Sequence, residues 1–435
     1  MMFKIQKELH IPNFEYFYFL VMIIFCAKMT PETTKMENFG GAIIPFSIPI
    51  ILTVILISRN KINIGISRLV NLCIVFILWS AISVIRFGSY NFEDFTLYLF
   101  LIYSVIIAYC HVGVYGEKMF PLYEDIMVKI ALLSIIIWIP FCLLFPGIGE
   151  AIFSMFPKSL TGYNVLYLFN WTGLGATGRF RNSGCAWEPG FYALMLAFAI
   201  FINLWRNNGL KMKGNKKLWI LVIAMLTTTS TTGYVVMLIE FFLFYVKSIS
   251  FKKVLGAALI FLPIIYYGSQ VSFIGEKISI SIEDSSDYLG LEGRLTWGEK
   301  NSEDKMAIDR IPSAVLQIEN FSHDPVIGYG LNDYNSYFFR TNNITNMAYC
   351  GGLVQIFSQF GLFIGLFVYY LLYRSSKTIN RHANSHNFDF MIVCMLLSIS
   401  YPIFRCPVFT SFWLFGYFYT IPSIKTRLIN EVATL

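Results

Sequence analysis

The chain has 435 residues, of which 56% are hydrophobic and only 14% are charged, with 42 phenylalanines and 26 tyrosines. A soluble domain carries about a quarter charged residues, so this composition excludes a soluble multidomain protein and indicates an integral membrane protein with aromatic side chains at both interfaces. The net charge of +7 does not indicate nucleic-acid binding, because the basic residues gather in alternate loops between apolar segments.

Apolar segments of about 20 residues are long enough to cross the hydrocarbon as helices. They predict a single all-α polytopic membrane domain over 1–435 with about twelve transmembrane helices. The division at the polar run 227–233 decides the count, because one long tilted helix there would invert the topology downstream. The predicted spans are 13–29, 40–58, 69–86, 95–112, 127–145, 189–206, 217–229, 232–248, 253–268, 349–373, 388–404 and 408–424.

The N-terminal segment carries Lys4 and Lys7 before the first apolar run, without a small-residue cleavage site after it. This arrangement favours an uncleaved first span over a signal peptide. Most of the eight cysteines lie inside apolar runs, and none forms a C-x-x-C pair. We therefore expect small core hydrophobes rather than a disulfide framework or a zinc site.

The loop charges predict the orientation. Loops 59–68, 206–217, 247–253 and 374–387 contain lysines and arginines but no Asp or Glu. The positive-inside rule places these loops and both termini in the cytoplasm. Two long loops, 146–188 and 269–348, then face outside, and the second holds twelve acidic and six basic residues.

The larger outer loop is longer than a connection requires. Its apolar positions Ile308, Ile311, Val315 and Ile318 predict a short amphipathic helix that lies on the membrane or on the bundle. The sequence from Asp324 to Gly330 reads as tight turns.

The segment from Gly178 to Gly190 places Arg179, Arg181 and Glu188-Pro189 directly before an apolar run of membrane-spanning length. Pro189 suits the first helical position, and Glu188 would be a cap-like acid at the positive end of the helix dipole. One interpretation is a capped helix start with arginines on lipid headgroups. The other is that the arginines hold an anion such as a pyrophosphate in forked contacts, while Glu188 acts as a general base or orients an arginine.

Further ionisable residues stand where they are unusual in a membrane protein. Arg294, Arg310 and Arg405 are basic residues on the predicted outer side, where Arg405 either reaches lipid headgroups or points into the same site. Glu240 lies in mid-span and is either functional or a neutral, hydrogen-bonded packing residue. His323 is the only histidine expected outside and is more often a surface residue than a catalyst.

Nucleotide and metal motifs are absent: the sequence has no P-loop, D-x-D, G-x-S-x-G or H-E-x-x-H pattern. We therefore expect no metal and no cofactor. A transferase at the outer face needs a donor that was activated beforehand, and a lipid-linked pyrophosphate sugar fits, because arginines can stabilise its anionic leaving group.

Five motifs in order give the chain a family resemblance. The first, Arg179-x-Arg181-x-x-Gly184 followed by Glu188-Pro189, resembles the R-x-x-G-x-x-x-E-P signature of the O-antigen polymerase and ligase superfamily, the Wzy-type polymerases and their ligase relatives. The resemblance covers roughly 175–370. The other four motifs are the break at Ser230 to Gly233, Gly293-Arg294 with Trp297, Asp324 to Gly330, and Gly361 to Gly365.

The resemblance implies a metal-independent glycosyltransferase at the outer, periplasmic face of the bacterial plasma (inner) membrane. It would transfer a growing glycan from undecaprenyl pyrophosphate onto the terminal sugar of an incoming lipid-linked repeat unit, in O-antigen or other surface polysaccharide synthesis. Arg179, Arg181 and Arg294 would bind pyrophosphate or glycan, and Glu188 would be the acid–base or positioning residue. Charge placement adds Arg310 and Arg405 as substrate-binding residues, and Trp297 and Asn346 join them from the motifs.

One departure from the family separates two activities. Family members, ligases especially, often carry a His-Asn pair before the span that follows the large loop, whereas the matching place here has Asn346 and no histidine. This favours a polymerase over a ligase that transfers finished glycan to a lipid core. A flippase or transporter is a further alternative, but it would show two similar halves. Partners in this interpretation are lipid-linked glycans, membrane lipid, and a chain-length regulator and flippase of the same pathway, with no nucleic acid.

Overall fold

The computed structural model describes the backbone of residues 11–27, 39–62, 64–88, 92–156, 162–172, 180–246, 306–308, 310–342, 347–349, 351–380 and 388–419, and the side chains of most of them. The predicted span 253–268 lies outside these residues. Within them the chain is mostly helical. The α-helices are α1 (Asn13–Cys26), α2 (Phe39–Arg59), α3 (Ile66–Phe87), α4 (Phe92–Tyr115), α5 (Met119–Trp138), α6 (Pro146–Phe153), α7 (Pro189–Arg206), α8 (Lys216–Thr227), α9 (Thr231–Val246), α13 (Arg310–His323), α14 (Tyr337–Thr341), α15 (Gln355–Asn380), α16 (Asp389–Ser398), α17 (Pro407–Trp413) and α18 (Phe415–Phe418).

Four helical stretches in the described part of the chain are long and apolar enough to cross a membrane. Shorter apolar helices lie at Asn13–Cys26, Ser47–Arg59, Thr231–Tyr245 and Asp389–Ser398. The chain is therefore an all-α membrane protein in its main architecture, as the composition predicts. The four stretches are Ile66–Phe87, Phe95–Leu144, Pro189–Arg206 and Gln355–Asn380.

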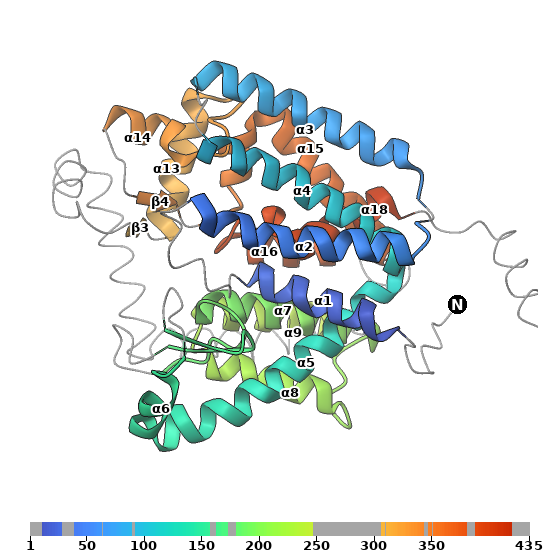
Figure 1. Cartoon of the computed structure of the whole chain (residues 1–435), viewed down its shortest axis with the longest axis vertical. Coiled ribbons are helices and arrows are strands. Elements are labelled where there is room, and N and C mark those ends of the chain that lie inside the picture. The colour runs from blue at the N-terminus through green and yellow to red at the C-terminus, as the bar shows by residue number, and fades with distance from the viewer. Residues whose placement is uncertain are drawn as a thin grey trace, which may run out of the picture.

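The long helices lie side by side and form a bundle (Figure 1). At one end of the bundle, on the left in Figure 1, lie α6, the strands that follow it, α13 and α14. We call this the loop end, because the described parts of 146–188 and 310–349 are found there. The connection between α7 and α8, which carries lysines, lies at the opposite end.

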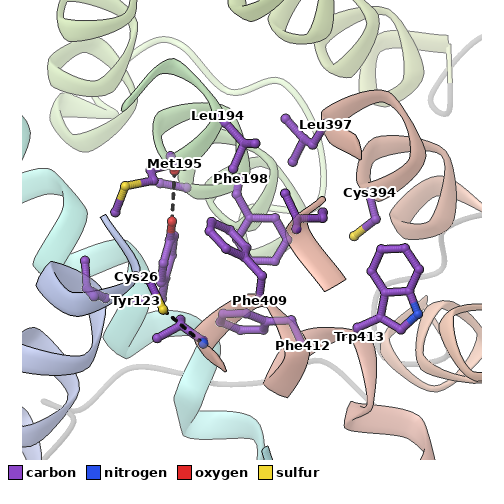
Figure 2. Close-up of a cluster of buried hydrophobic side chains, with 14 of the residues drawn as sticks. Cys26, Tyr123, Leu194, Met195, Phe198, Cys394, Leu397, Phe409, Phe412 and Trp413 are labelled. Atoms are coloured by element: carbon purple, nitrogen blue, oxygen red, sulfur yellow. Dashed lines mark hydrogen bonds between the residues drawn. The ribbon is translucent and has the colours of Figure 1, made fainter. Parts of the chain in front are cut away.

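Helix α7 is the centre of the packing. Every residue from Phe191 to Leu204 is buried, as expected for a helix that is apolar on all sides. Phe198 contacts the rings of Tyr123, Phe409 and Phe412, with its centroid 4.7 Å from that of Phe412. Figure 2 shows this cluster. The segment that precedes α7 is thus attached to the most enclosed of the long helices.

Polar contacts fix α7 to its neighbours as well. The Tyr123 hydroxyl donates to the Met195 carbonyl at 3.1 Å within the core (Figure 2). At the end opposite the loops, Glu124 accepts from the Asn203 amide at 2.6 Å and forms an ion pair with Arg206. Removing one partner of such a buried pair leaves an uncompensated charge, so these contacts hold α7 in one register against α5.

Small strands accompany the helices, which the all-α prediction did not include. Strands β1 (Tyr163–Val165) and β2 (Phe169–Trp171) form an antiparallel hairpin, with Val165 opposite Phe169. Strands β3 (Met306–Ile308) and β4 (Met347–Tyr349) pair in parallel. The hairpin packs against α6 through Phe153 and Trp171, so its apolar side chains are covered at the loop end.

The amphipathic helix predicted over 308–320 is present as α13, but its predicted face is wrong. Ile308 lies in β3, and Ile318 is 59% exposed. The buried face instead carries Leu316 with the polar residues Gln317 and Asn320. They are satisfied by tyrosine hydroxyls, since Gln317 Nε2 and Asn320 Nδ2 each donate to one, and buried polar groups are stable when paired in this way.

Candidate functional site

The segment before α7 is held by Asn182, which is fully buried. Its amide nitrogen donates to Thr227 Oγ1 at 2.8 Å and to Ser134 Oγ at 3.1 Å. Its oxygen accepts from the Gly184 backbone N–H at 2.9 Å. Its own backbone N–H donates to the Thr227 carbonyl. The segment is therefore bonded to the end of α8 through both backbone and side chain.

Arg181 contacts the break between α8 and α9. Its Nε donates to Thr229 Oγ1 at 2.9 Å and to the Thr228 carbonyl at 3.1 Å, and its Nη2 reaches the Thr229 carbonyl at 3.4 Å. The first motif of the family resemblance thus contacts the two residues that directly precede the second motif, Ser230 to Gly233. We call residues 181–190 and 227–233 together the signature unit.

Glycines permit the close approaches within the signature unit. Gly184 has φ +48°, and a Cβ there would lie 2.2 Å from the Tyr192 ring. A Cβ at Gly233 would lie 2.7 Å from Ala193 Cβ and 2.8 Å from Met225 Sδ. Any side chain at these positions would force α7, α8 and α9 apart.

Glu188 immediately precedes α7 with extended backbone angles, and Pro189 is the first helical residue, as the sequence predicts. Glu188 thus occupies the N-cap position at the positive end of the helix dipole, as expected, although its side chain makes no capping hydrogen bond. The neighbouring backbone is fixed instead: the Trp187 N–H donates to the Ala27 carbonyl at 3.0 Å. Glu188 is half-buried at the loop end.

The fourth and fifth motifs also meet. The Tyr329 and Gly330 N–H groups donate to the Ser358 and Gln359 carbonyls at 2.9 and 3.1 Å. Gly361 has φ +72°, and a Cβ there would lie 2.1 Å from the Val326 carbonyl oxygen. We call residues 324–330 and 358–362 together the glycine unit.

Asp324, at the start of the glycine unit, binds two arginines. It is 4% exposed and forms ion pairs with Arg86, at the end of α3, and with Arg340, at 3.4 Å. Two guanidinium groups against one carboxylate leave one unit of positive charge. Asp324 therefore does more than begin a turn, because it fixes an excess of positive charge at the loop end.

Asp333 lies in a 3₁₀ turn (Asp333–Asn335) between α13 and α14. Its Oδ1 accepts from the Tyr329 hydroxyl at 3.1 Å, from Gln355 Nε2 at 3.3 Å and from Gln359 Nε2 at 3.4 Å. Burial raises the pKa of the Asp333 carboxyl, and the charge of Arg405 acts in the opposite direction. Asp333 and Arg405 are thus electrostatic neighbours.

Arg405 belongs to the turn between α16 and α17, which lies between the two units. On one side, Tyr401 packs edge-on against Phe191, with ring centroids 5.2 Å apart. On the other side, a Cβ on Gly352 would lie 2.4 Å from Pro402 Cα. The Arg405 side chain is half-buried. The signature unit and the site of Asp333 are therefore joined through this turn.

A small cavity opens beside the signature unit, between the ends of α7, α9 and α16. The Ser400 hydroxyl at its wall is buried without a hydrogen-bond partner in the described part of the chain. Among the residues that the structure describes, no three His, Cys, Asp or Glu side chains gather as a metal ion would require. The cavity is lined by Gly190, Leu194, Thr232, Gly233, Val236, Leu397 and Ser400.

The structure describes the other sequence-predicted residues to different extents. Arg310 is the first residue of α13, described by its backbone alone. His323 stacks on Tyr337 with centroids 3.4 Å apart. Glu240 is fully buried, and neither carboxyl oxygen has a hydrogen-bond partner in the described part of the chain, so the expectation of a hydrogen-bonded packing residue is wrong. Outside the described residues lie Arg179, Arg294, Trp297 and Asn346.

Several residues that the structure brings to the loop end were missed from the sequence. Arg86 and Arg340 carried a usable signal, because both are basic residues on the predicted outer side, where basic residues are under-used. Asp333 and Gln355 carried none, since their proximity depends on how α15 packs beside the 3₁₀ turn.

Comparison with known proteins adds no family to this geometry. No model of a known protein family matches the chain, and no curated protein matches it either.

Proposed function

We propose that this protein is a Wzy-type polymerase of lipid-linked oligosaccharide repeat units. It would be a metal-independent glycosyltransferase that works at the outer face of the bacterial plasma membrane, with about twelve spans and both termini in the cytoplasm. The loop end of the bundle is then the outer face. The product would be O-antigen or another surface polysaccharide.

The observation that carries the proposal is the pairwise assembly of motifs that are far apart in the sequence. Arg181 and Asn182 of the first motif bind Thr227 to Thr229, which directly precede the second motif, and the glycine unit joins 324–330 to 358–362. Motifs that only stabilised separate helix ends would have no reason to pair in this way. Each unit includes part of one of the two long predicted outer loops, 146–188 and 269–348.

The charge at the loop end suits a polyprenyl pyrophosphate donor. Arg86 and Arg340 outweigh Asp324 there, and Arg181 belongs to the same end. As the sugar–phosphate bond breaks, negative charge develops on the pyrophosphate, and fixed guanidinium groups stabilise it without reorganisation. We assign Arg179, Arg181 and Arg294 to this role, with Glu188 as the acid–base or positioning residue.

The remaining assigned residues would hold the glycan. Arg310, Arg405, Trp297 and Asn346 are the substrate-binding set in this proposal. An aromatic face and polar donors together are suited to sugars, because a sugar presents both an apolar ring face and hydroxyl groups. The missing histidine near Asn346 favours polymerase over ligase, and the unequal halves of the chain argue against a flippase.

A deletion strain tests the proposal in cells. Without the gene we expect single-repeat caps on the lipid core, and the wild-type gene should restore the ladder of longer chains. Polymer stranded on the lipid carrier in the deletion strain would instead indicate a ligase. Arg181→Lys should fail to restore the ladder, because an ammonium group cannot reproduce contacts made through Nε and Nη2. Lys213→Ala, at an exposed lysine of the α7–α8 connection at the opposite end, is the control and should restore it.

A further inference from the structure

We propose that Asp333, Gln355 and Arg405 form the subsite for the acceptor sugar, in which the Asp333 carboxylate takes the proton of the attacking hydroxyl. This inference rests on the proposed polymerase function and adds a base and an acceptor site to it.

Asp333 is held rigidly for such a role. Three side chains donate to its Oδ1, from Tyr329, Gln355 and Gln359. The Tyr349 backbone N–H also bonds this carboxylate. All three of these side-chain bonds go to Oδ1, and none of them uses Oδ2. A substrate hydroxyl that donates to Oδ2 would therefore meet a carboxylate whose rotamer is already fixed, as efficient proton transfer requires.

Gln355 has a buried acceptor atom that a ligand could satisfy. It is 2% exposed. Its Nε2 donates to Asp333, yet its Oε1 has no hydrogen-bond partner in the part of the chain described. Buried polar atoms without partners are rare in folded proteins. A sugar hydroxyl that donates to Oε1 would satisfy it, and the same sugar would then lie beside the Asp333 carboxylate.

Arg405 supplies donors to the subsite. No carboxylate among the described residues forms an ion pair with its side chain within 4.0 Å, although its charge acts on Asp333. The guanidinium group offers five N–H donors and no acceptor. Together with the acceptor atoms of Asp333 and Gln355, it forms a mixed donor and acceptor set that matches a polyhydroxylated ring.

The position of the turn also separates donor from acceptor. Tyr401, four residues before Arg405, packs against Phe191 of the helix that follows the signature unit. The charge of Arg405 itself acts on Asp333 in the 3₁₀ turn. We therefore assign the pyrophosphate of the donor to the signature-unit side and the acceptor sugar to the Asp333 side.

The reaction balances with these two substrates alone. The acceptor hydroxyl oxygen forms a bond to the anomeric carbon of the donor glycan as the bond from that carbon to the pyrophosphate oxygen breaks. The electron pair of the broken bond leaves on the polyprenyl pyrophosphate. The hydroxyl proton passes to Asp333 and later to solvent.

The test uses the full-length protein reconstituted in liposomes, with the lipid-linked repeat units that accumulate in the deletion strain as substrate. Asp333→Asn preserves the shape of the side chain, and we expect it to lower the rate of chain growth about 100-fold or more. Undecaprenyl pyrophosphate without sugar should still compete for the donor pocket within about threefold of wild type. Asp333→Glu should recover part of the rate.

Gln355→Leu should mainly raise KM for the acceptor. Glu150→Gln, at an exposed carboxylate of α6, is the control and should change neither quantity.

Two outcomes would overturn the inference while the proposed function stands. One is an active wild type with Asp333→Asn within about fivefold of its rate. The other is a loss of undecaprenyl pyrophosphate binding in Asp333→Asn that parallels the loss of rate, since that would make the residue structural. A wild type that extends no lipid-linked repeat unit would instead overturn the proposed function, and the subsite with it.

Discussion

Replacing Asn182 by alanine should destabilise the protein more than any other single polar truncation in the signature unit. The substitution removes three hydrogen bonds of the side chain, to Ser134, Thr227 and Gly184. Each buried hydrogen bond contributes about 1 kcal/mol net, so we expect a loss of about 3 kcal/mol. The loss grows further if the Gly184 N–H finds no new partner.

Equilibrium unfolding of the purified protein by SDS in mixed micelles measures this loss. Asn342→Ala removes the same side chain from the half-buried residue that follows α14 and should cost less than about 1 kcal/mol. The reasoning would be refuted if Asn182→Ala unfolded at the same SDS fraction as the wild type. Chain growth should fall along with stability in Asn182→Ala, because the substitution releases the segment of Arg181 from the α8–α9 break.

Three further predictions follow from individual positions. Gly361→Ala should destabilise the protein by more than about 2 kcal/mol, since the new Cβ would overlap the Val326 carbonyl and the residue has a positive φ. Gly147→Ala is the control and should be neutral in the same unfolding assay, because a Cβ at Gly147 would have no atom within 4 Å. Glu240→Met should raise the unfolding free energy by about 1 kcal/mol or more, because it removes a buried carboxyl without a partner, and a lower stability would contradict this. Because burial raises the pKa of Asp333, the carboxylate takes up its proton at a higher pH than an ordinary aspartate, so the midpoint of the acid limb of kcat/KM should lie above about pH 4. A midpoint at or below about 4 would contradict the role of Asp333 as base.

The helical framework could be read from the sequence because lipid imposes a simple rule on it. A segment that crosses the hydrocarbon must be long, apolar and helical. Helices α3, α7 and α15 have the length and the apolar composition that this rule requires. The break between α8 and α9 could also be predicted from the sequence, since the run of Thr, Ser and Gly at 227–233 favours a turn. The structure separates the two helices between Thr227 and Thr231.

Less of the candidate site could be predicted from the sequence, because its contacts join elements that are far apart in the chain. The buried face of α13 was predicted wrongly since Gln317 and Asn320 are polar and become favourable only beside the hydroxyls of Tyr329 and Tyr349. Asp333 looked like an ordinary loop acid. Its partners come from the first two turns of α15, which only the packing of the glycine unit brings near.

Arg181 is a candidate that the sequence identified, but its contact with the α8–α9 break could be found only in the structure. Charge placement singled out Arg181, and the contact with Thr228 and Thr229 is now explicit. That contact uses Nε and Nη2 for protein oxygens. Arg181 therefore both positions the signature unit and, in our proposal, contributes charge to the donor side.

The central claim is that this protein extends lipid-linked glycans at the outer face. The most direct measurement is reconstitution of the purified wild type in liposomes with lipid-linked repeat units exposed to the face that carries the loop end, with no nucleotide present. The account predicts a ladder of lipid-linked polymer together with release of one polyprenyl pyrophosphate for each bond formed. Repeat units that stay at single length, with or without movement across the bilayer, would contradict it.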